Sequence, residues 1–295
     1  MTLILIEGLI MSNDKNNKAI TLVEALPYIK QFAGQIMVIK YGGSLMVNEA
    51  LRETFAKDIV LLRYVGIKPV IVHGGGKEIT KWMKKLGKEA VFIDGQRFTD
   101  SETMELTEMV LSGKVNNEIV SLLNHNGGKA VSLSGKSANI FKAKRIRSKK
   151  DQDLGFVGTI ESVDTKLIHT LCEEGYIPVI SSIGSDMNGG SLNLNADNVA
   201  SAVARYLDSK KLIYLTDVDG VIVNNELVSQ LVLDDAKELM SHPDIQGGML
   251  PKLDCCIQAI DGGVESVHVI NGSTDHAVLL EIFTNRGIGT MVTLT

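Results

Sequence analysis

The chain has 295 residues, 44% of them hydrophobic and 22% charged, which is typical of a globular chain with room for one large domain or two lobes. Its formal net charge of −5, without a basic aromatic patch, argues against nucleic-acid binding. Cys172, Cys255 and Cys256 have neither the spacing of a metal site nor that of a disulfide framework, which fits a reducing compartment. We therefore expect a cytoplasmic protein that binds neither nucleic acid nor membranes.

The N-terminal segment precedes the first core strand. Residues 1–10 are apolar but contain Glu7, lack a basic leader and are too short to span a bilayer, so Met11 is an alternative start. A polar run follows them, and we expect residues 1–19 to be disordered.

Residues 20–34 predict an amphipathic helix, because Leu22, Leu26 and Ile29 recur at helical spacing. Pro27 lies inside this helix and should kink or split it, since proline removes a helical hydrogen bond. A helix in this place packs either on its own domain or on a neighbouring subunit.

The first core strand runs into glycines. In residues 36–44, IMVIKYGGS, an apolar run ends in Lys40 and is followed by Gly42 and Gly43. Glycines let backbone N–H groups approach an anion closely, and the lysine adds a positive charge. A second turn of this kind, VIVHGGG, occupies residues 70–76 and opens the next helix. Two such turns in succession predict a phosphate-binding site.

Helix-like and strand-like patterns alternate along the rest of the chain. We expect Thr99 or Asp100 to cap the helix that begins at Ser101, and Asp164 to cap a later one. The basic run over residues 142–150 predicts a solvated hairpin face. Apolar stripes predict helices around residues 51–62, 79–86, 101–113, 115–123, 164–174 and 200–207, and strands at residues 91–92, 176–182, 211–218 and 266–271.

This alternation predicts an α/β fold, a three-layer αβα sandwich around a mostly parallel sheet, with ligands at the carboxyl ends of the strands. Several motifs are missing from the sequence. There is no GxxxxGK[ST], no GxGxxG after a strand with a matching acid, and no HRD or DFG set. A P-loop NTPase, a dinucleotide-binding dehydrogenase and a protein kinase are therefore poor candidates.

Seven ordered motifs resemble the amino-acid kinase family, and within it the arginine-sensitive N-acetylglutamate kinase branch. They are IKYGGS, VIVHGGG, GQRFTD, VISSIG, NLNADNVA, LTDVDGV and GGMLPK. The resemblance implies ATP-dependent phosphorylation of the γ-carboxylate of N-acetyl-L-glutamate, in arginine biosynthesis. Another carboxylate kinase of the family, or a non-catalytic arginine or nucleotide sensor on the same scaffold, is the alternative. The resemblance also implies an N-terminal lobe over residues 35–208, for acetylglutamate binding and dimerisation, and a C-terminal lobe over residues 209–295.

The same resemblance assigns catalytic roles. It implies that Lys40 and Lys252 flank the phosphoryl group in flight, where fixed cations stabilise developing charge. Asp197 is expected to orient both lysines, and its alternative role is to complement the dipole of the helix that it opens. No general base is needed, because the γ-carboxylate is already ionised at neutral pH.

The acceptor and nucleotide contacts follow in the same way. Gly75 and Gly76 are expected to hold the substrate, Asn193 its acetamido group and Arg97 its α-carboxylate; the alternative for Arg97 is a surface ion pair. ATP is expected in the C-terminal lobe, with Mg²⁺ bound through the phosphates and no protein metal site. The residues implied in ATP binding are Gly42, Gly43, Thr216, Asp217, Gly220, Gly248 and Met249.

Regulation is the last implication. The helix over residues 20–34 resembles the element that joins homodimers into a hexamer, a trimer of dimers, in the arginine-sensitive branch. Glu281 is expected to bind L-arginine as effector, with Lys211 and Gly287 nearby and Tyr28 closing over it. The alternative is that Glu281 is an exposed helix residue and that the N-terminal helix packs within its own subunit.

Overall fold

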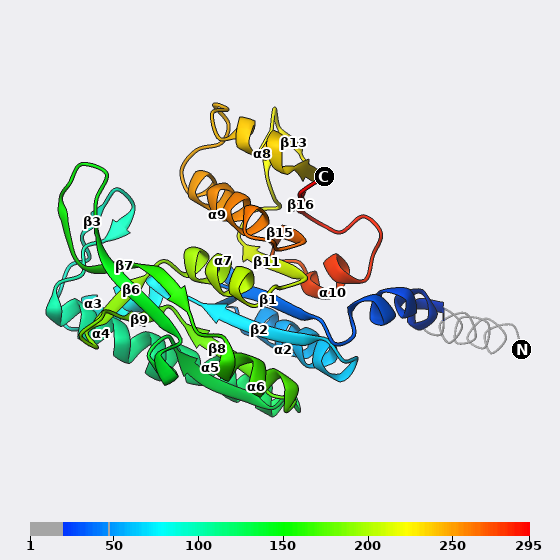
Figure 1. Ribbon diagram of the computed structural model, residues 1–295, viewed down its shortest axis with the longest axis horizontal. Helices are drawn as coiled ribbons and strands as arrows, with labels where there is room; N and C mark the ends of the chain where they lie inside the picture. The colour runs from blue at the N-terminus through cyan, green and yellow to red at the C-terminus, as the bar shows by residue number, and fades with distance from the viewer. Residues whose placement is uncertain (1–19, 47) are drawn as a thin grey trace, which may run out of the picture.

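The computed structural model of the chain describes residues 20–46 and 48–295 (Figure 1). The disorder expected over residues 1–19 lies outside the described residues. An eight-stranded sheet, in the order β14-β16-β15-β11-β1-β2-β8-β5, forms the centre of the fold. All its neighbours pair in parallel except β15 and β16, which confirms the predicted mostly parallel sheet. Its strands are β1 (Ile36–Tyr41), β2 (Lys68–His73), β5 (Ala130–Ser134), β8 (Ile177–Ser181), β11 (Lys211–Thr216), β14 (Gln230–Val232), β15 (Ser266–Asn271) and β16 (Thr290–Thr293).

Helices cover both faces of this sheet, which confirms the three-layer αβα sandwich (Figure 1). Alternate side chains of a strand point to opposite faces, so Val38 joins one apolar core while Met37 and Ile39 join the other. The first core lies under α6 (Lys166–Glu173), α7 (Ala196–Tyr206), α8 (Leu233–Leu239) and α9 (Met249–Asp261), and the second under α2 (Glu49–Tyr64), α3 (Gly76–Lys85), α5 (Asn116–His125) and α10 (Ala277–Ile282).

Among the residues that the structure describes, shorter strands form three small sheets outside the eight-stranded sheet. The predicted basic hairpin is present as β6 (Phe141–Arg147) and β7 (Asp153–Val163), which close a four-stranded ring with β9 (Ile183–Ser185) and β10 (Ser191–Leu194). The backbone N–H of Lys149, at the tip of this hairpin, donates to Asp94 Oδ2 at 3.2 Å. The remaining hairpins are β3 (Phe92–Ile93) with β4 (Gln96–Arg97), and β12 (Ile222–Val223) with β13 (Glu226–Leu227).

One continuous helical run replaces the two helices predicted over residues 101–113 and 115–123. It consists of α4 (Ser101–Glu108), a π-helical segment η2 (Met109–Val115) and α5. The prediction was wrong because the wider π-helical turns carry Gly113 without ending the helix. Asp100 is the residue that caps this run, since its side chain accepts the N–H of Thr103 at 2.8 Å. Turns of this kind are frequent at functional sites, and Leu111 lies in this one.

The N-terminal helix is helical over residues 20–32 without interruption, so the predicted split at Pro27 is wrong. The carbonyl that loses its helical partner belongs to Val23, which is 68% exposed, and water can satisfy it there. Leu22 is 73% exposed and Phe32 only 4%, so this helix is anchored to the body at its C-terminal end (Figure 1).

Smaller differences concern element boundaries. Leu86, predicted to lie in the apolar stripe of α3, is the C-cap of that helix and is 66% exposed. The short strand predicted at residues 91–92 is β3, one residue later. The Asp164 side chain accepts the N–H of Lys166 at 3.0 Å, but the N-cap of α6 is Thr165. All three cysteines are buried and unpaired.

A buried carboxylate joins α2 to the start of α10. The Asp58 side chain is 1% exposed, and its Oδ1 is 2.6 Å from Nδ1 of His276. Burial raises the pKa of Asp58 to about 6, although the hydrogen bond from His276 and those from the N–H groups of Leu279 and Val278 act in the opposite direction. Oδ2 of the same carboxyl has no hydrogen-bond partner within the described part of the chain.

The Asp58→Asn variant should become more stable relative to wild type as pH rises. The folded state holds a proton on Asp58 that the unfolded chain releases, so this contribution is complete below about pH 4 and is lost as pH rises through about 6. On the order of 2 kcal/mol is involved, and the Tm difference between variant and wild type should shift by about 4 °C in favour of the variant between pH 4.5 and pH 7. Asp164→Asn, an exposed change, is the control; a shift as small as in this control would contradict the prediction.

Candidate active site

Two lysines from distant parts of the chain meet one carboxylate at the carboxyl edge of the sheet. Lys40 lies near the end of β1, Asp197 in the first turn of α7 and Lys252 in the first turn of α9. Lys40 Nζ is 2.8 Å from Asp197 Oδ1, and Lys252 Nζ donates to Oδ2 at 2.7 Å. The structure thus brings together the three residues predicted as catalytic.

The carboxylate of this cluster is ionised throughout the physiological pH range. Burial raises the pKa of Asp197, but the charges of Lys40 and Lys252 outweigh that effect and hold the pKa at about 2. One anion between two cations leaves a net positive charge, which is available to an incoming anion. The alternative role of Asp197 as a complement to the helix dipole accounts for its place in α7 but not for these two contacts.

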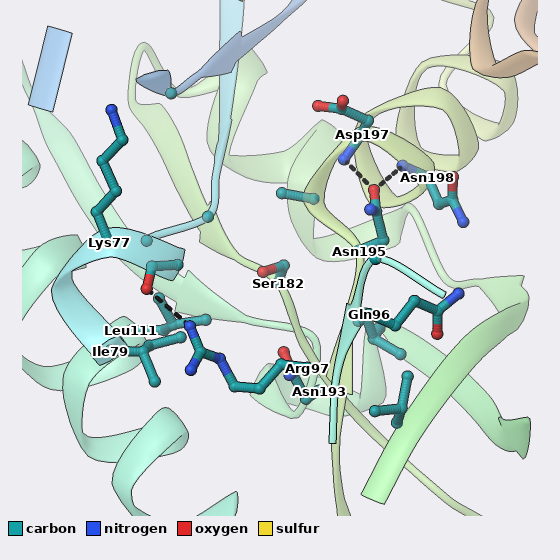
Figure 2. Close-up of a pocket in the computed structure, with 18 of the residues that line it drawn as sticks. Lys77, Ile79, Gln96, Arg97, Leu111, Ser182, Asn193, Asn195, Asp197 and Asn198 are labelled. Atoms are coloured by element: carbon teal, nitrogen blue, oxygen red, sulfur yellow. Dashed lines mark hydrogen bonds between the residues drawn. The ribbon is translucent and has the colours of Figure 1, made fainter. Parts of the chain in front are cut away.

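The backbone around the cluster is held in place by side-chain caps and by glycines. Asn195 caps α7 by accepting the N–H groups of Asp197 at 2.8 Å and Asn198 at 3.2 Å (Figure 2). A Cβ atom on Gly42 would lie 2.6 Å from Lys40 Nζ, so glycine here leaves the ammonium group free to take its position beside Asp197. The second predicted glycine of this turn, Gly43, begins the short 3₁₀ helix η1 (Gly43–Met46).

The second glycine turn makes room for neighbouring elements rather than for a charge. A Cβ atom on Gly74 would lie 3.1 Å from Ala196 Cβ, and one on Gly75 would lie 2.6 Å from Cδ2 of Leu111 in η2. Gly76 opens α3, and a Cβ atom on it would meet nothing within 4 Å. The glycines therefore allow α7 and η2 to approach the end of β2 closely.

A cavity of about 340 Å³ adjoins the lysine–carboxylate cluster. Figure 2 shows Arg97 and Asn193 on one side of it and Asp197 on the other. Lys252 is not among the residues that line it. The lining includes every residue predicted to bind the acceptor, two of the charged cluster and an apolar wall: Gly75, Gly76, Arg97, Asn193, Lys40, Asp197, Ile79, Phe92 and Leu111.

Arg97 is buried, 7% exposed, and faces this cavity, so its interpretation as a surface ion pair is wrong. Its Nη2 donates to Thr80 Oγ1 at 2.7 Å and to the carbonyl of Gly76 at 2.9 Å, and its guanidinium lies 4.8 Å from the ring centroid of Phe92. Burial lowers the pKa of Arg97, yet arginine stays charged in proteins. Among the described residues it has no carboxylate partner, so a ligand carboxylate can supply one.

Asn193 on β10 is linked to Arg97 through Thr99. Its side-chain amide donates to Thr99 Oγ1 at 3.2 Å, and that hydroxyl donates to the Arg97 carbonyl at 2.8 Å. The cavity therefore offers a guanidinium and an amide on one side, the paired Lys40 and Asp197 on the other, and apolar side chains in its wall. This arrangement suits a small molecule with two negatively charged ends and an amide.

Of the residues predicted to bind the nucleotide, Gly42 lines this cavity, and Thr216, Asp217, Gly220, Gly248 and Met249 lie outside it. Thr216 ends β11, which pairs with β1, and Asp217 follows it in an exposed position. Gly248 and Met249 begin α9, the helix whose first turn carries Lys252. Gly220 is packed against Thr290 and Leu227, since a Cβ atom there would lie 2.5 Å from Thr290 Oγ1. That packing explains the glycine, and its role toward a nucleotide stays a prediction.

The residues predicted to bind an effector form a second cluster, between β11, β15 and α10. Glu281 is 6% exposed, so the alternative that it is an exposed helix residue is wrong. Its Oε2 accepts the N–H of Ile288 at 2.7 Å, and Gly287, at φ +60°, packs against the same oxygen. Tyr28 in the N-terminal helix donates its hydroxyl to Asn285, in the loop that contains Gly287.

His268 links this cluster together, and the sequence analysis did not identify it. Its Nδ1 is 2.6 Å from Glu281 Oε1, and its Nε2 is 2.9 Å from Lys211 Nζ and from Ser266 Oγ. Burial lowers the pKa of His268, and a neutral ring satisfies both contacts by donating from Nδ1 and accepting at Nε2. Its signal in the sequence was a histidine within an otherwise apolar strand. Phe32 was also not identified as a member of this cluster, and its ring centroid lies 5.2 Å from Lys211 Nζ.

Residues 20–46 and 48–295 contain no group of three His, Cys, Asp or Glu side chains placed to hold a metal ion. Among the helices of the same residues, none is both long enough and apolar enough to cross a membrane.

Comparison with known proteins places this architecture in a family. The family model described as "Amino acid kinase family" matches residues 35–271. The chain is 53% identical to an acetylglutamate kinase of Methanococcus maripaludis, over 93% of this chain and 97% of that protein. It is 52% identical to one of Kosmotoga olearia, over 92% and 95%, respectively.

A solved structure agrees in fold. N-acetylglutamate synthase from Neisseria gonorrhoeae, complexed with coenzyme A and N-acetyl-glutamate, is 28% identical and has a TM-score of 0.84. The match covers 93% of this chain but 63% of the synthase, so the chain spans less than two thirds of that protein. Given the family match over most of its length and the identities above 50%, the chain belongs to the amino acid kinase family.

Proposed function

We propose that the chain transfers the γ-phosphoryl group of ATP to the γ-carboxylate of N-acetyl-L-glutamate, which gives N-acetyl-L-glutamyl 5-phosphate for arginine biosynthesis. The observation that carries this proposal is the Lys40–Asp197–Lys252 cluster beside a cavity lined by Arg97, an arginine that has no carboxylate partner among the described residues. The names of the curated relatives support the choice of acceptor.

The acceptor binds across the cavity. Arg97 receives the α-carboxylate, because a guanidinium can bind a carboxylate through two hydrogen bonds. Asn193 contacts the acetamido group, which has one donor and one acceptor to satisfy. Gly75 and Gly76 lie at the start of α3 and offer backbone groups to the substrate. With the α-carboxylate on Arg97, the γ-carboxylate points toward Lys40 and Asp197 on the other side of the cavity.

Phosphoryl transfer forms a bond between a γ-carboxylate oxygen and the γ-phosphorus and breaks the bond from that phosphorus to the bridging oxygen of ADP. The acceptor is ionised at neutral pH, so no residue has to remove a proton from it. Charge spreads over the phosphoryl oxygens and the leaving oxygen during the transfer, and fixed cations stabilise that charge. Lys40 and Lys252 supply the cations, and Asp197 holds both at defined positions.

The chain has two lobes. The acceptor binds in the lobe over residues 35–208, and ATP binds in the lobe over residues 209–295, against the end of β11 and the start of α9. The start of α9 at Gly248 and Met249 favours negative charge through the helix dipole. The proposed nucleotide contacts also include Gly42, Gly43, Thr216, Asp217 and Gly220. Mg²⁺ enters as part of the nucleotide substrate, as that ion prefers phosphate oxygens and water.

The activity is tested by ADP release coupled to a second enzyme, together with trapping of the acyl phosphate by hydroxylamine. N-acetyl-L-glutamate should support turnover, whereas L-aspartate, L-glutamate and carbamate should not. Turnover with one of these other acceptors instead would assign the chain to another carboxylate kinase of the family. Nucleotide or arginine binding without turnover of any acceptor would identify a sensor.

We further propose that L-arginine inhibits the enzyme and that the chain forms a hexamer of three dimers. Glu281, Lys211 and Gly287 form a cluster with His268, and Tyr28 from the N-terminal helix contacts the adjacent loop. The Neisseria gonorrhoeae synthase has also been solved in complex with coenzyme A and L-arginine, which supports an arginine-binding scaffold. The exposed apolar side chains of the N-terminal helix, Leu22 and Val23, need a partner surface.

Removing the residues before Gln35 should reduce the mass in solution from that of a hexamer to that of a dimer, because the exposed helix face is lost. In the full-length chain, Glu281→Ala should raise the arginine concentration for half-inhibition at least 10-fold, since a cationic effector loses its carboxylate. Sedimentation and inhibition curves measure both effects. Glu102→Ala, which removes a surface carboxylate paired with Lys88, is the control for the second. An unchanged mass after truncation, or full activity in saturating arginine, would contradict the proposal.

A further inference from the structure

Tyr214 lies beneath the lysine–carboxylate cluster and contacts two of its members. It is on β11, is 0% exposed and pairs in register with Lys40 on the neighbouring strand β1. Its hydroxyl donates to the main-chain carbonyl of Asp197 at 3.0 Å, and its ring centroid lies 5.2 Å from Lys252 Nζ. One rigid side chain therefore contacts the backbone of the central carboxylate and the charge of one lysine.

Packing alone does not require these contacts. A buried phenylalanine fills nearly the same volume, whereas a buried hydroxyl needs a hydrogen-bond partner and costs stability without one. In Tyr214 that partner is a carbonyl in the first turn of α7, the turn that aims the Asp197 side chain. The ring meanwhile presents the negative face of its π-system to an ammonium group, which is an attractive contact.

The register of the sheet explains why one residue reaches both elements. Val38 and Tyr214 belong to the core beneath α7 and α9, and Lys40, two residues after Val38, points to the same face of β1. Asp197 enters from α7 and Lys252 from α9, on that same face. Tyr214 lies where the strand and the two helices converge.

We propose that Tyr214 is a positioning residue for phosphoryl transfer. Its hydroxyl fixes the first turn of α7 and hence the Asp197 carboxylate, and its ring fixes the position of the Lys252 ammonium group. This inference rests on the proposed function, since the cluster acts on charge that develops in the transition state. Tyr214 does not line the cavity, so it affects the turnover rate and leaves acceptor binding unchanged.

The test compares three variants of the full chain with wild type, each in the forward kinase assay. Tyr214→Phe keeps the ring and removes the hydroxyl, and should lower kcat about 5-fold to 10-fold with both KM values within twofold. Tyr214→Leu also removes the ring and should lower kcat further. Tyr206→Phe is the matched control, because that hydroxyl also donates to a main-chain carbonyl, at Glu161, from the opposite end of α7. It should retain wild-type kcat.

A double-mutant cycle separates positioning from general destabilisation. In a Lys252→Ala background, Tyr214→Leu should cost at least threefold less in kcat than it does in the native background, because the ring no longer has an ammonium group to hold. Equal costs in both backgrounds, or a wild-type kcat for Tyr214→Phe, would overturn the inference. Inactive wild-type enzyme would instead refute the proposed function. Thermal melting identifies a variant that fails to fold, and Tyr214→Phe, which preserves the packing, still decides the question.

Discussion

Lys252→Ala is expected to lower kcat about 100-fold to 1,000-fold, the cost of removing one preorganised donor from a site of developing charge. Lys40→Ala should have an effect of the same order. The KM values should change much less, since these ammonium groups stabilise charge that appears mainly during transfer. Steady-state kinetics with saturating ATP and varied acceptor measure both parameters.

The effects of the two substitutions should not add. Both lysines hold the same carboxylate, at 2.8 Å and 2.7 Å, so removing one changes the position of the other. The double variant should therefore lose less than the product of the single losses. Lys237→Ala is a matched control, because it also breaks a lysine–aspartate pair, with Asp261 at 3.1 Å, on the surface of α8. Unchanged kcat in Lys252→Ala, or KM effects as large as those on kcat, would show that the roles are misassigned.

Arg97→Lys is expected to raise the KM for N-acetyl-L-glutamate about 10-fold and Arg97→Ala about 100-fold, with much smaller changes in kcat. A lysine keeps the charge but loses the two-bond geometry, and an alanine leaves a carboxylate of the acceptor unpaired in the cavity. Arg145→Lys is the matched control, since that guanidinium also stacks on a ring, 4.0 Å from the centroid of Phe156, but on the exposed hairpin. An unchanged KM in both Arg97 variants would remove the α-carboxylate from this site.

A milder change tests the orientation of Arg97. Thr80→Val keeps the shape of the side chain and removes the oxygen that accepts from Nη2 at 2.7 Å. It should raise the acceptor KM about threefold to 10-fold, the effect of one lost hydrogen bond to a charged group that retains its second acceptor, the Gly76 carbonyl. Thr170→Val is the control, because Thr170 makes the same bond as Thr80 to the carbonyl four residues earlier, on α6.

Local pattern was sufficient for most of the architecture. Buried parallel strands have long apolar runs, and their helices have apolar stripes, so Ile36–Tyr41 and the stripe from Leu51 to Leu62 were predicted correctly. The π-helical segment was not, because the break expected at Gly113 follows from local propensity, and tertiary contacts overrode it. Pro27 is a different case, because the helix continues there with the freed carbonyl of Val23 exposed to water.

The residue types at the candidate site were evident from the motifs, but their geometry was not. Lys40, Asp197 and Lys252 are separated by more than fifty residues each, and only the convergence of β1, α7 and α9 puts their charges within 2.8 Å. The same convergence places Tyr214 beneath them, and no sequence pattern distinguishes it from an ordinary core tyrosine. His268 is a similar case: its strand predicts burial, whereas its partners Glu281 and Lys211 come from other elements. Sequence thus determined which chemistry is present, and the tertiary structure decided which groups meet, because the distances between side chains depend on how the elements pack.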